Sequence, residues 1–367
     1  MSRADPNTLF DAIQLGAITA PNRVLMAPLT RGRADAGFVP SADMQIYYAQ
    51  RASAGLIISE ATGISVEGLG WPSAPGIWSD EQTAAWKPVT DAVHAAGGRI
   101  ICQLWHMGRI VHSDYLDGQP PVSASATTAP GHAYTPTGKQ PYCEARALDI
   151  AEIPRLIADY RNAARQAKAA GFDGVQLHAA NGYLIDQFLR DNSNFRDDIY
   201  GSSIENRIRL LCEVTAALIE IWGADNVSVR LSPNGDSQGA DDSNPVPLFT
   251  AAAAALSDMG IAFLELREPG PEGTFGRSDV PLISPDIRKV FTGPLVLNSD
   301  YTNDLAIAAL ASGVADAISF GRPFISNPDL PERLRTGAAM NADQPANWYS
   351  AGPEGYIDFP ALDADKA

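Results

Sequence analysis

Hydrophobic and polar positions along this chain of 367 residues follow two alternating patterns. Short apolar or β-branched runs recur, and each is followed by a loop and then by a longer segment with apolar residues every three or four positions. The first pattern predicts buried strands, and the second predicts helices with one apolar face. The predicted strands are Val24–Ala27, Leu56–Glu60, Arg99–Leu104, Gly174–His178, Val227–Leu231, Phe263–Arg267, Pro294–Leu297 and Ala317–Phe320.

Strands that alternate with helices in this way form parallel βαβ units. Eight such units predict an α/β protein whose strands close into a (β/α)8 TIM barrel. The predicted helices are Ser41–Ala54, Asp80–Ala96, Ile150–Ala170, Ile204–Trp222, Pro247–Met259, Pro285–Phe291, Asn303–Ser312 and Asn327–Thr336.

Three segments add to this repeating pattern. Apolar and polar residues alternate around Gly16, which predicts an N-terminal β-hairpin that closes the bottom of the barrel. Residues 111–147 form a long insertion after the third strand, too long for an ordinary connection, and we expect them to form a lid. Residues 337–367 are too rich in aromatic side chains for a disordered end, and we expect them to pack near the barrel mouth. Residues 1–367 are therefore expected to form one domain.

Composition narrows the class of partner. The net charge is −16 and the pI is near 4.6, so the average field repels nucleic acid and anionic membranes. The chain has no apolar run typical of a signal peptide, and none of the roughly 20 residues needed to span a bilayer. Its three cysteines form no CxxC motif. We expect a cytoplasmic protein with small-molecule partners, and the sequence favours neither a monomer nor a homodimer.

Residues with the chemistry of an active site follow the fourth predicted strand, at the end of a barrel where catalytic groups lie. His178 and Asn181 are neutral donors three positions apart, and aimed at one point they would bind an oxygen that gains negative charge. Tyr183 has an intrinsic pKa of about 10 and is suited to protonating a carbanion-like centre. The alternatives are that His178 is a hydrogen-bonded core histidine and that Tyr183 is a packing residue.

A second candidate site follows the last predicted strand. Gly321 allows close approach of the backbone, Arg322 is next, and a helix is expected to begin near Asn327. In barrels of this kind such a loop binds a phosphate group, although an ordinary loop with a surface arginine is the alternative. Carboxylates are scarce at the strand ends, and His178 has no nearby His or Cys partner. This disfavours glycosidase chemistry and a metal centre.

Several motifs resemble those of one enzyme family. The chain resembles the old yellow enzyme family of FMN-dependent ene-reductases, and is most similar to its bacterial N-ethylmaleimide reductase and pentaerythritol tetranitrate reductase members. The matching stretches run in the family's order from about residue 22 to residue 362. They are NRVLMAPLTRGRA, YYAQRASAGLIISEAT, CQLWHMGR, PVSASA, AGFDGVQLHAANGYLIDQFL, SNFRDDIYGSSIENR, VRLSP, ISFGRPFISNPDLPERL and EGYIDFPAL.

The resemblance implies an oxidoreductase with non-covalent FMN in the barrel mouth and NADPH or NADH as the reductant. It implies reduction of the C=C bond of α,β-unsaturated carbonyls, maleimides or nitroalkenes by hydride transfer from the flavin N5. Two alternatives stay open: a nitroester or nitroarene reductase of the same fold, and a non-catalytic flavin-binding protein.

The resemblance also implies roles for particular residues. His178 and Asn181 would hold the substrate oxygen, and Tyr183 would protonate the α-carbon from the opposite face. The residues implied to bind FMN are Pro28, Thr30, Ala61, Gln103, Arg230, Ser299, Gly321 and Arg322. The aromatic residues implied to shape the substrate pocket are Trp71, Trp105 and Tyr349.

Two positions depart from the family's pattern. Ser202 stands where relatives have a second glycine. The loop after the seventh strand reads Asn298-Ser299-Asp300, where relatives have a small residue and glycine. Serine lacks the conformational range of glycine, and Asp300 adds negative charge beside the expected phosphate. Asn181, where several relatives have histidine, is expected to change substrate preference more than reaction type.

Overall fold

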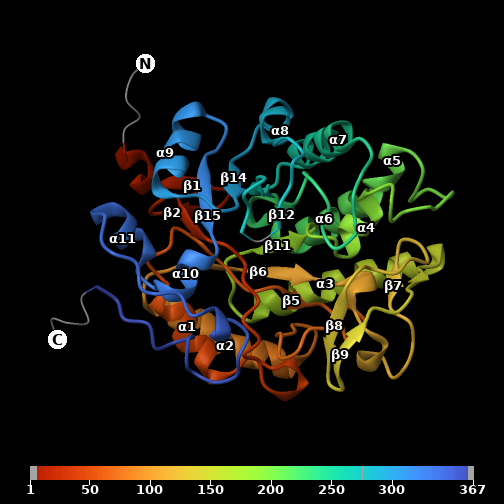
Figure 1. Cartoon of the computed structure of the whole chain (residues 1–367), viewed down its shortest axis with the longest axis horizontal. Coiled ribbons are helices and arrows are strands. Elements are labelled where there is room, and N and C mark those ends of the chain that lie inside the picture. The colour runs from red at the N-terminus through yellow and green to blue at the C-terminus, as the bar shows by residue number, and fades with distance from the viewer. Residues whose placement is uncertain (1–5, 275, 363–367) are drawn as a thin grey trace.

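The strands of the computed structural model, which describes residues 6–274 and 276–362, form a closed parallel barrel. The neighbour order is β11-β12-β13-β14-β15-β3-β4-β6, and pairing of β11 with β6 closes the ring. Figure 1 shows these strands in the middle of the molecule with helices around them. The eight predicted strands and the (β/α)8 barrel are confirmed. The barrel strands are β3 (Val24–Met26), β4 (Ile57–Ile58), β6 (Ile100–Trp105), β11 (Val175–His178), β12 (Val227–Leu231), β13 (Phe263–Arg267), β14 (Leu295–Asn298) and β15 (Ala317–Phe320).

A short antiparallel hairpin closes one end of the barrel. It consists of β1 (Ile13–Leu15) and β2 (Ile18–Ala20). Leu15 and Ile18 pack in one buried cluster with residues from the starts of the barrel strands, among them Leu25 and Phe263. Because this end of the barrel is filled with apolar side chains, polar chemistry is confined to the opposite end.

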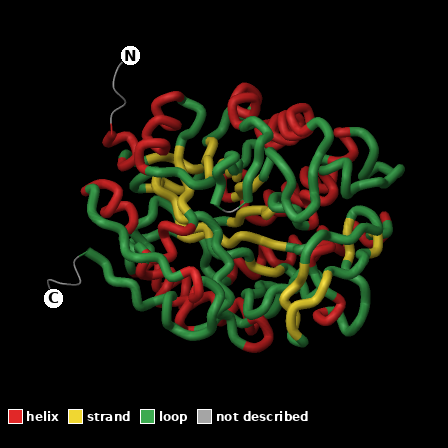
Figure 2. The backbone as a smooth tube through the Cα atoms, in the orientation of Figure 1, coloured by secondary structure: helices red, strands yellow, loops and turns green. Residues whose placement is uncertain are grey.

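Helices surround the strands, as the red segments in Figure 2 show. Most helix predictions are confirmed within a few residues, but the predicted helix Ile204–Trp222 is interrupted at Ile208. The α-helices are α1 (Ala42–Gln50), α2 (Asp80–Ala95), α3 (Ile153–Ala169), α4 (Leu184–Leu189), α5 (Ile204–Arg207), α6 (Arg209–Trp222), α7 (Pro245–Asp258), α8 (Ser284–Val290), α9 (Asn303–Ser312), α10 (Arg322–Ser326) and α11 (Leu330–Thr336). Short 3-10 helices are η1 (Pro6–Phe10), η2 (Ala36–Phe38), η3 (Gly108–Ile110), η4 (Ser113–Tyr115), η5 (Ile150–Glu152), η6 (Ala224–Asn226) and η7 (Pro345–Asn347).

The predicted start of the last helix near Asn327 is wrong. A separate short helix, α10, begins at Arg322, and α11 begins only at Leu330. Asn327 has extended backbone angles, and its side-chain nitrogen donates to the carbonyl of Pro323 at 2.8 Å. The backbone N–H of Asn327 also donates to this carbonyl at 3.2 Å. The helix stops here because Pro328 follows, and proline disfavours helical angles at the residue before it.

The insertion at 111–147 forms structure of its own. It holds η4 and the strands β7 (Val122–Ser123), β8 (His132–Thr135), β9 (Gly138–Pro141) and β10 (Arg146–Ala147). Strands β8 and β9 form a hairpin at the edge of the molecule in Figure 2. Outside the insertion, the short strand β5 (Thr62–Gly63) pairs with β6. The rings of Trp71 and Tyr134 lie 6.4 Å apart, so the hairpin contacts the loop after β5. Its function as a lid stays a prediction.

The C-terminal segment lies against the loop that follows β3. Arg31 donates to the carbonyl oxygens of Trp348 at 3.0 Å and Gly355 at 2.9 Å. The ring of Tyr356 is stacked on that of Tyr47 in α1, with centroids 4.2 Å apart. Arg31 therefore ties residues 348–355 to the end of the barrel at which the candidate residues lie. Residues 363–367 of the predicted C-terminal segment lie outside the described residues.

Candidate active site

A connected set of buried polar side chains crosses the inside of the barrel. Gln103 on β6 donates to Gln176 on β11 at 2.8 Å, and Gln176 donates to Glu265 on β13 at 3.0 Å. Arg230 on β12 binds the other oxygen of Glu265 and donates to Asn298 on β14 at 2.7 Å. Side chains two positions apart on a strand share a face, so this polar set lies above the apolar end of the barrel. It fixes the orientation of Gln103 and Arg230.

Trp105, His178 and Tyr183 pack together above this polar set. The ring of Tyr183 is nearly perpendicular to both others, with centroid distances of 5.0 Å to each. Burial, followed by the charges of two nearby arginines, lowers the pKa of His178 well below its usual 6.5. Burial also raises the pKa of Tyr183. Both side chains are therefore neutral at physiological pH.

The tautomer of His178 follows from one contact. The backbone N–H of Ala180 donates to Nδ1 of His178 at 3.4 Å. Nδ1 is then the acceptor of the neutral ring, so Nε2 carries the proton. The structure thus makes His178 a hydrogen-bond donor through Nε2.

Asn181 is held on three sides. Its backbone has a φ of 60°, in the left-handed region that asparagine adopts more readily than most residues. Its N–H donates to the hydroxyl of Ser232 at 2.7 Å, and its carbonyl accepts from Gln238 at 2.7 Å. Its side-chain oxygen accepts from Arg267 at 3.4 Å. The short turn after β11 is therefore fixed by residues that follow β12 and by the end of β13.

The two loops predicted to bind phosphate, residues 298–300 at the end of β14 and residues 321–322 after β15, lie beside one another. Arg322 donates to the hydroxyl of Thr274 at 2.5 Å, and Thr274 donates its backbone N–H to Asp300 at 3.1 Å. The carboxylate of Asp300, a departure from the family's pattern, is thus bound by the neighbouring loop. Ser299 has a φ of 129°, a conformation that glycine adopts without strain. Since α10 has only five residues, Arg322 rather than a long helix dipole supplies positive charge next to Gly321.

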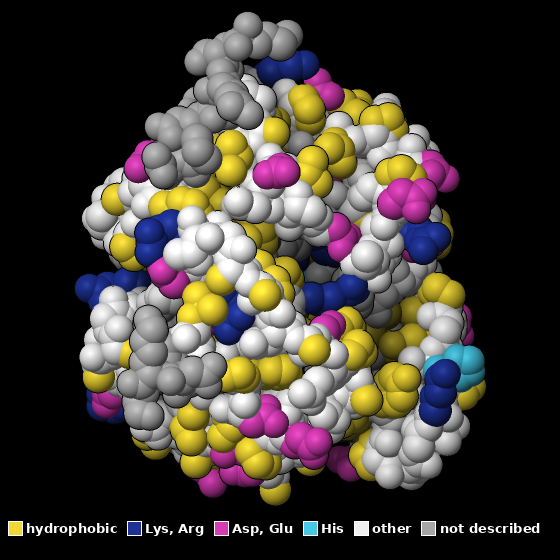
Figure 3. Space-filling view, turned by 60° about the vertical axis from the view of Figure 1, so that its left-hand side comes forward, with side chains coloured by type: hydrophobic (Ala, Val, Ile, Leu, Met, Phe, Trp, Pro, Cys, Tyr) yellow, Lys and Arg dark blue, Asp and Glu magenta, His cyan; other side chains and the backbone are white. Residues whose placement is uncertain are grey.

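The remaining predicted residues lie on the loops after β3 and β4 and on the C-terminal segment. Pro28 and Thr30 are partly buried, and Ala61 is buried. Trp71 and Tyr349 pack against one another with centroids 5.6 Å apart. In Figure 3, Lys or Arg side chains border a hollow near the middle of the visible face. A local group of cations is what an anionic ligand requires on a chain with this net negative charge.

The donor set fits the FMN that the resemblance implies. In the described part of the chain, Nε of Arg230 and Nε1 of Trp105 are buried without a hydrogen-bond partner. Buried donors without partners are rare in native proteins. A bound group with oxygen and nitrogen acceptors along one edge would satisfy them, and Gln103 is fixed nearby to bind the same edge.

The sequence did not identify every residue of this region. Glu265 and Gln176 are fully buried and join Gln103 to Arg230. Glu265 is the one charged residue within the apolar part of its strand, and it shares a face with Arg267 two positions later. The spacing of Glu265 and Arg267 was a local signal that the carboxylate faces the inside of the barrel. The partners of Glu265 lie on other strands, so the sequence did not identify them.

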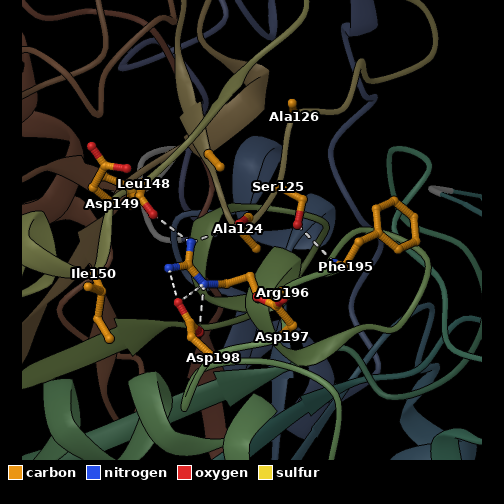
Figure 4. Close-up of a pocket in the computed structure, with 11 residues that line it drawn as sticks. Ala124, Ser125, Ala126, Leu148, Asp149, Ile150, Phe195, Arg196, Asp197 and Asp198 are labelled. Carbon is orange, nitrogen blue, oxygen red and sulfur yellow. Dashed lines mark hydrogen bonds and ion pairs between the residues drawn. The ribbon is translucent and has the colours of Figure 1, made fainter.

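A surface pocket of about 550 Å³ contains none of the predicted site residues (Figure 4). Its wall is formed by residues 124–126, 147–150 and 195–198. Arg196 is fully engaged there, because it donates to the carbonyls of Ala124 at 3.1 Å and Leu148 at 2.5 Å and to the carboxylate of Asp198. This arginine fastens Ala124 within the insertion and Leu148 just after it to the loop after α4, which is a structural role.

Two further findings concern the described residues alone. Within 6–274 and 276–362, no three His, Cys, Asp or Glu side chains gather as a metal ion would require. No helix in the same part of the chain is long and apolar enough to cross a membrane.

Comparison with known proteins places the chain among flavin oxidoreductases. A model of the NADH:flavin oxidoreductase / NADH oxidase family matches residues 8–341. The old yellow enzyme homologue from Zymomonas mobilis is 61% identical, with a TM-score of 0.95 and coverage of 97% of this chain and 100% of that one. Morphinone reductase in complex with tetrahydroNAD is 45% identical, with a TM-score of 0.92 and coverage of 98% and 99%. The putative 12-oxophytodienoate reductase 11 of Oryza sativa subsp. japonica is 41% identical over 361 residues, 97% of this chain and 98% of the relative.

Proposed function

Because this chain belongs to the NADH:flavin oxidoreductase / NADH oxidase family and is an FMN-dependent oxidoreductase of the old yellow enzyme type, we propose that it is an ene-reductase. Its substrates are activated alkenes, in which a carbonyl, imide or nitro group is conjugated to the C=C bond. Its reductant is NADPH or NADH, and it works in the cytoplasm, where both nicotinamides are available. The free state of Cys102, Cys143 and Cys212 supports that compartment.

One observation carries the proposal. His178 presents a neutral N–H donor, Asn181 lies three residues later on the same fixed turn, and the hydroxyl-bearing ring of Tyr183 packs 5.0 Å from His178. Two donors bind the oxygen of an activating group and draw electron density from the conjugated β-carbon. Neutral donors suit this task, because they bind the oxygen more strongly as its negative charge increases.

The cofactor residues are those that the resemblance implies, and the unpartnered buried donor of Arg230 supports them. FMN, when bound, supplies the hydride. Arg230 and Gln103, oriented by Glu265 and Gln176, bind the polar edge of its ring system, together with Thr30, Pro28 and Ala61. Gly321, Arg322 and Ser299 bind its phosphate. Trp71 and the buried ring face of Trp105 line the substrate pocket and keep water from the reacting atoms, and the exposed Tyr349 borders its opening.

Tyr183 supplies the proton that completes the reduction. Its hydroxyl keeps its proton at neutral pH because burial raises its pKa. The proton passes from this hydroxyl to the α-carbon of the alkene, and solvent then reprotonates the tyrosinate. Gln238 donates to the carbonyl of Asn181 at 2.7 Å, and its side chain, acting on Tyr183, offsets part of the rise in that pKa.

The experiment follows the flavin colour without oxygen. The purified protein is expected to be yellow, to lose its colour with NADPH or NADH, and to regain it when 2-cyclohexenone is added. Reduced flavin that no alkene reoxidises faster than oxygen does would leave a flavin-binding protein without ene-reductase activity. A nitrate ester added in place of the enone tests the alternative, since nitrite release faster than enone turnover indicates a nitroester reductase.

A further inference from the structure

Arg267 lies at the end of β13, and no role follows for it from the sequence. It contacts Asn181, which together with His178 forms the proposed oxygen clamp, the pair that binds the substrate oxygen. It is buried, and its Nη1 donates to the side-chain oxygen of Asn181 at 3.4 Å. A Cβ at Gly276 would lie 2.7 Å from Nη2 of Arg267, so the loop after β13 closes tightly over the guanidinium. Its position is therefore set by packing as well as by hydrogen bonds.

The chemistry of the pair fixes the direction of the amide. A guanidinium has five N–H donors and no acceptor, whereas an amide has an oxygen acceptor on one side and an NH₂ donor on the other. Asn181 must turn its oxygen toward Arg267, and its Nδ2 then points to the opposite side. The backbone of Asn181 is held by Ser232 and Gln238 and cannot swing to compensate.

A free amide would have no such preference. The two ends of an asparagine side chain are nearly equal in shape, so rotation by half a turn exchanges donor and acceptor. An Asn181 oxygen facing the substrate oxygen would repel it, because both are acceptors. The clamp works only when the amide presents its nitrogen.

We propose that Arg267 is the positioning residue that makes Asn181 a hydrogen-bond donor toward the substrate oxygen of a ketone, imide or nitro group. This inference rests on the proposed function, since it concerns the same oxygen. Burial, followed by the charge of Arg230, lowers the pKa of Arg267 to about 10. The guanidinium is therefore still charged at physiological pH and keeps the amide oriented there.

Binding of cyclohexanone, a ketone that the enzyme cannot reduce, measures the clamp without turnover. Its dissociation constant is obtained from the change in the flavin spectrum of the FMN-loaded protein. Arg267→Met keeps the bulk and removes the donors, and we expect it to raise this constant about tenfold, the loss of roughly one hydrogen bond. Arg267→Lys keeps a group that only donates, so its dissociation constant for cyclohexanone is expected to stay within about threefold of that of the parent. Arg277→Met removes an exposed arginine of the same loop and should change nothing.

A double-mutant cycle separates positioning from a general structural effect. If Arg267 acts through Asn181, then Arg267→Met added to Asn181→Ala changes the dissociation constant by less than about twofold, since the amide is already absent. Three results would overturn the proposal. They are additive losses of cyclohexanone affinity in the double variant, no loss in Arg267→Met, and an equal loss in Arg277→Met. A parent protein that binds cyclohexanone and reduces no alkene would contradict the proposed function alone, because the cycle would still report how the ketone is held.

Discussion

Arg230 and Glu265 form an ion pair inside the barrel, with Nη1 of the arginine 2.5 Å from a carboxylate oxygen of the neighbouring strand. Both side chains are buried. The pair leaves Nε of Arg230 without a partner in the described part of the chain, so the arginine is held in place while one of its donors stays available. Glu265 thus links the stability of the barrel to the orientation of a proposed flavin ligand.

Removing Glu265 tests this link. Glu265→Ala leaves the Arg230 charge buried without its partner, and we expect a loss of about 3–5 kcal/mol in the free energy of unfolding. Urea unfolding of the FMN-loaded variant and parent measures it. Glu220→Ala, which breaks the exposed pair with Arg161, is the control and should cost less than about 1 kcal/mol. Equal losses in the two variants would contradict a special role for the buried pair.

Tyr183→Phe removes the proposed proton donor and keeps the ring. Reduction of 2-cyclohexenone by the prereduced protein is expected to slow by about 10²- to 10⁴-fold. Reduction of the flavin by NADPH or NADH should change little, because that step requires no proton from Tyr183. Stopped-flow absorbance measures the two half-reactions separately. Tyr115→Phe, in the insertion, is the control, and a parallel fall in both half-reactions would assign Tyr183 a packing role.

The pH dependence of alkene reduction follows from two opposite pKa shifts. His178 donates as the neutral ring at any pH above its lowered pKa, and Tyr183 acts as an acid at any pH below its raised pKa. The rate should therefore be flat from about pH 6.5 to about pH 10, the ordinary pKa values of the two groups. Single-turnover rates across this range check it. A step centred near neutral pH in the parent and absent from His178→Ala would mean that His178 titrates normally.

Arg322→Ala tests the phosphate site. Loss of a charge-assisted hydrogen bond should weaken FMN binding by about 1.5–3 kcal/mol, roughly 10- to 100-fold. The fluorescence of released flavin during dilution gives the dissociation constant. Arg335→Ala, which removes an exposed arginine paired with Glu332, provides the comparison. Unchanged FMN affinity in Arg322→Ala would make Arg322 an ordinary loop residue.

Glu60 predicts a pH-dependent stability. It is buried at the end of β4, where it accepts from the backbone of Arg31 at 3.1 Å and the hydroxyl of Tyr48 at 3.2 Å. Burial raises its pKa to about 7. The folded state then binds more protons than the unfolded state between about pH 4.5 and pH 7, so this group makes stability fall as pH rises through that window.

Glu60→Gln should remove this loss. From pH 5 to pH 8 the free energy of unfolding of the variant should rise relative to that of the parent. The size of the pKa shift sets this rise on the order of 3 kcal/mol. Urea unfolding at the two pH values, at one FMN concentration, measures the difference. The exposed Glu144→Gln serves as the matched control, and the same pH dependence in all three proteins would exclude Glu60 as the cause.

Local sequence patterns were enough to predict the barrel. Apolar runs and helical periodicity repeat along the chain, and alternation around Gly16 predicted the hairpin that fills one end. The grouping of His178, Asn181 and Tyr183 was also visible, because three residues within six positions share one turn. The start of α11 was missed although the sequence held a local signal, since Pro328 disfavours helical angles at Asn327 and separates α10 from α11.

The sequence by itself determined which residues stand at the strand ends, because burial and helix formation depend on neighbours a few positions away. Only the tertiary structure decided what those residues bind. Arg267 meets Asn181 across 86 positions, and Gln103 reaches Arg230 through side chains of two other strands. Such contacts form when the barrel closes and buries donors and acceptors away from water, so that each must find a partner that no local pattern specifies.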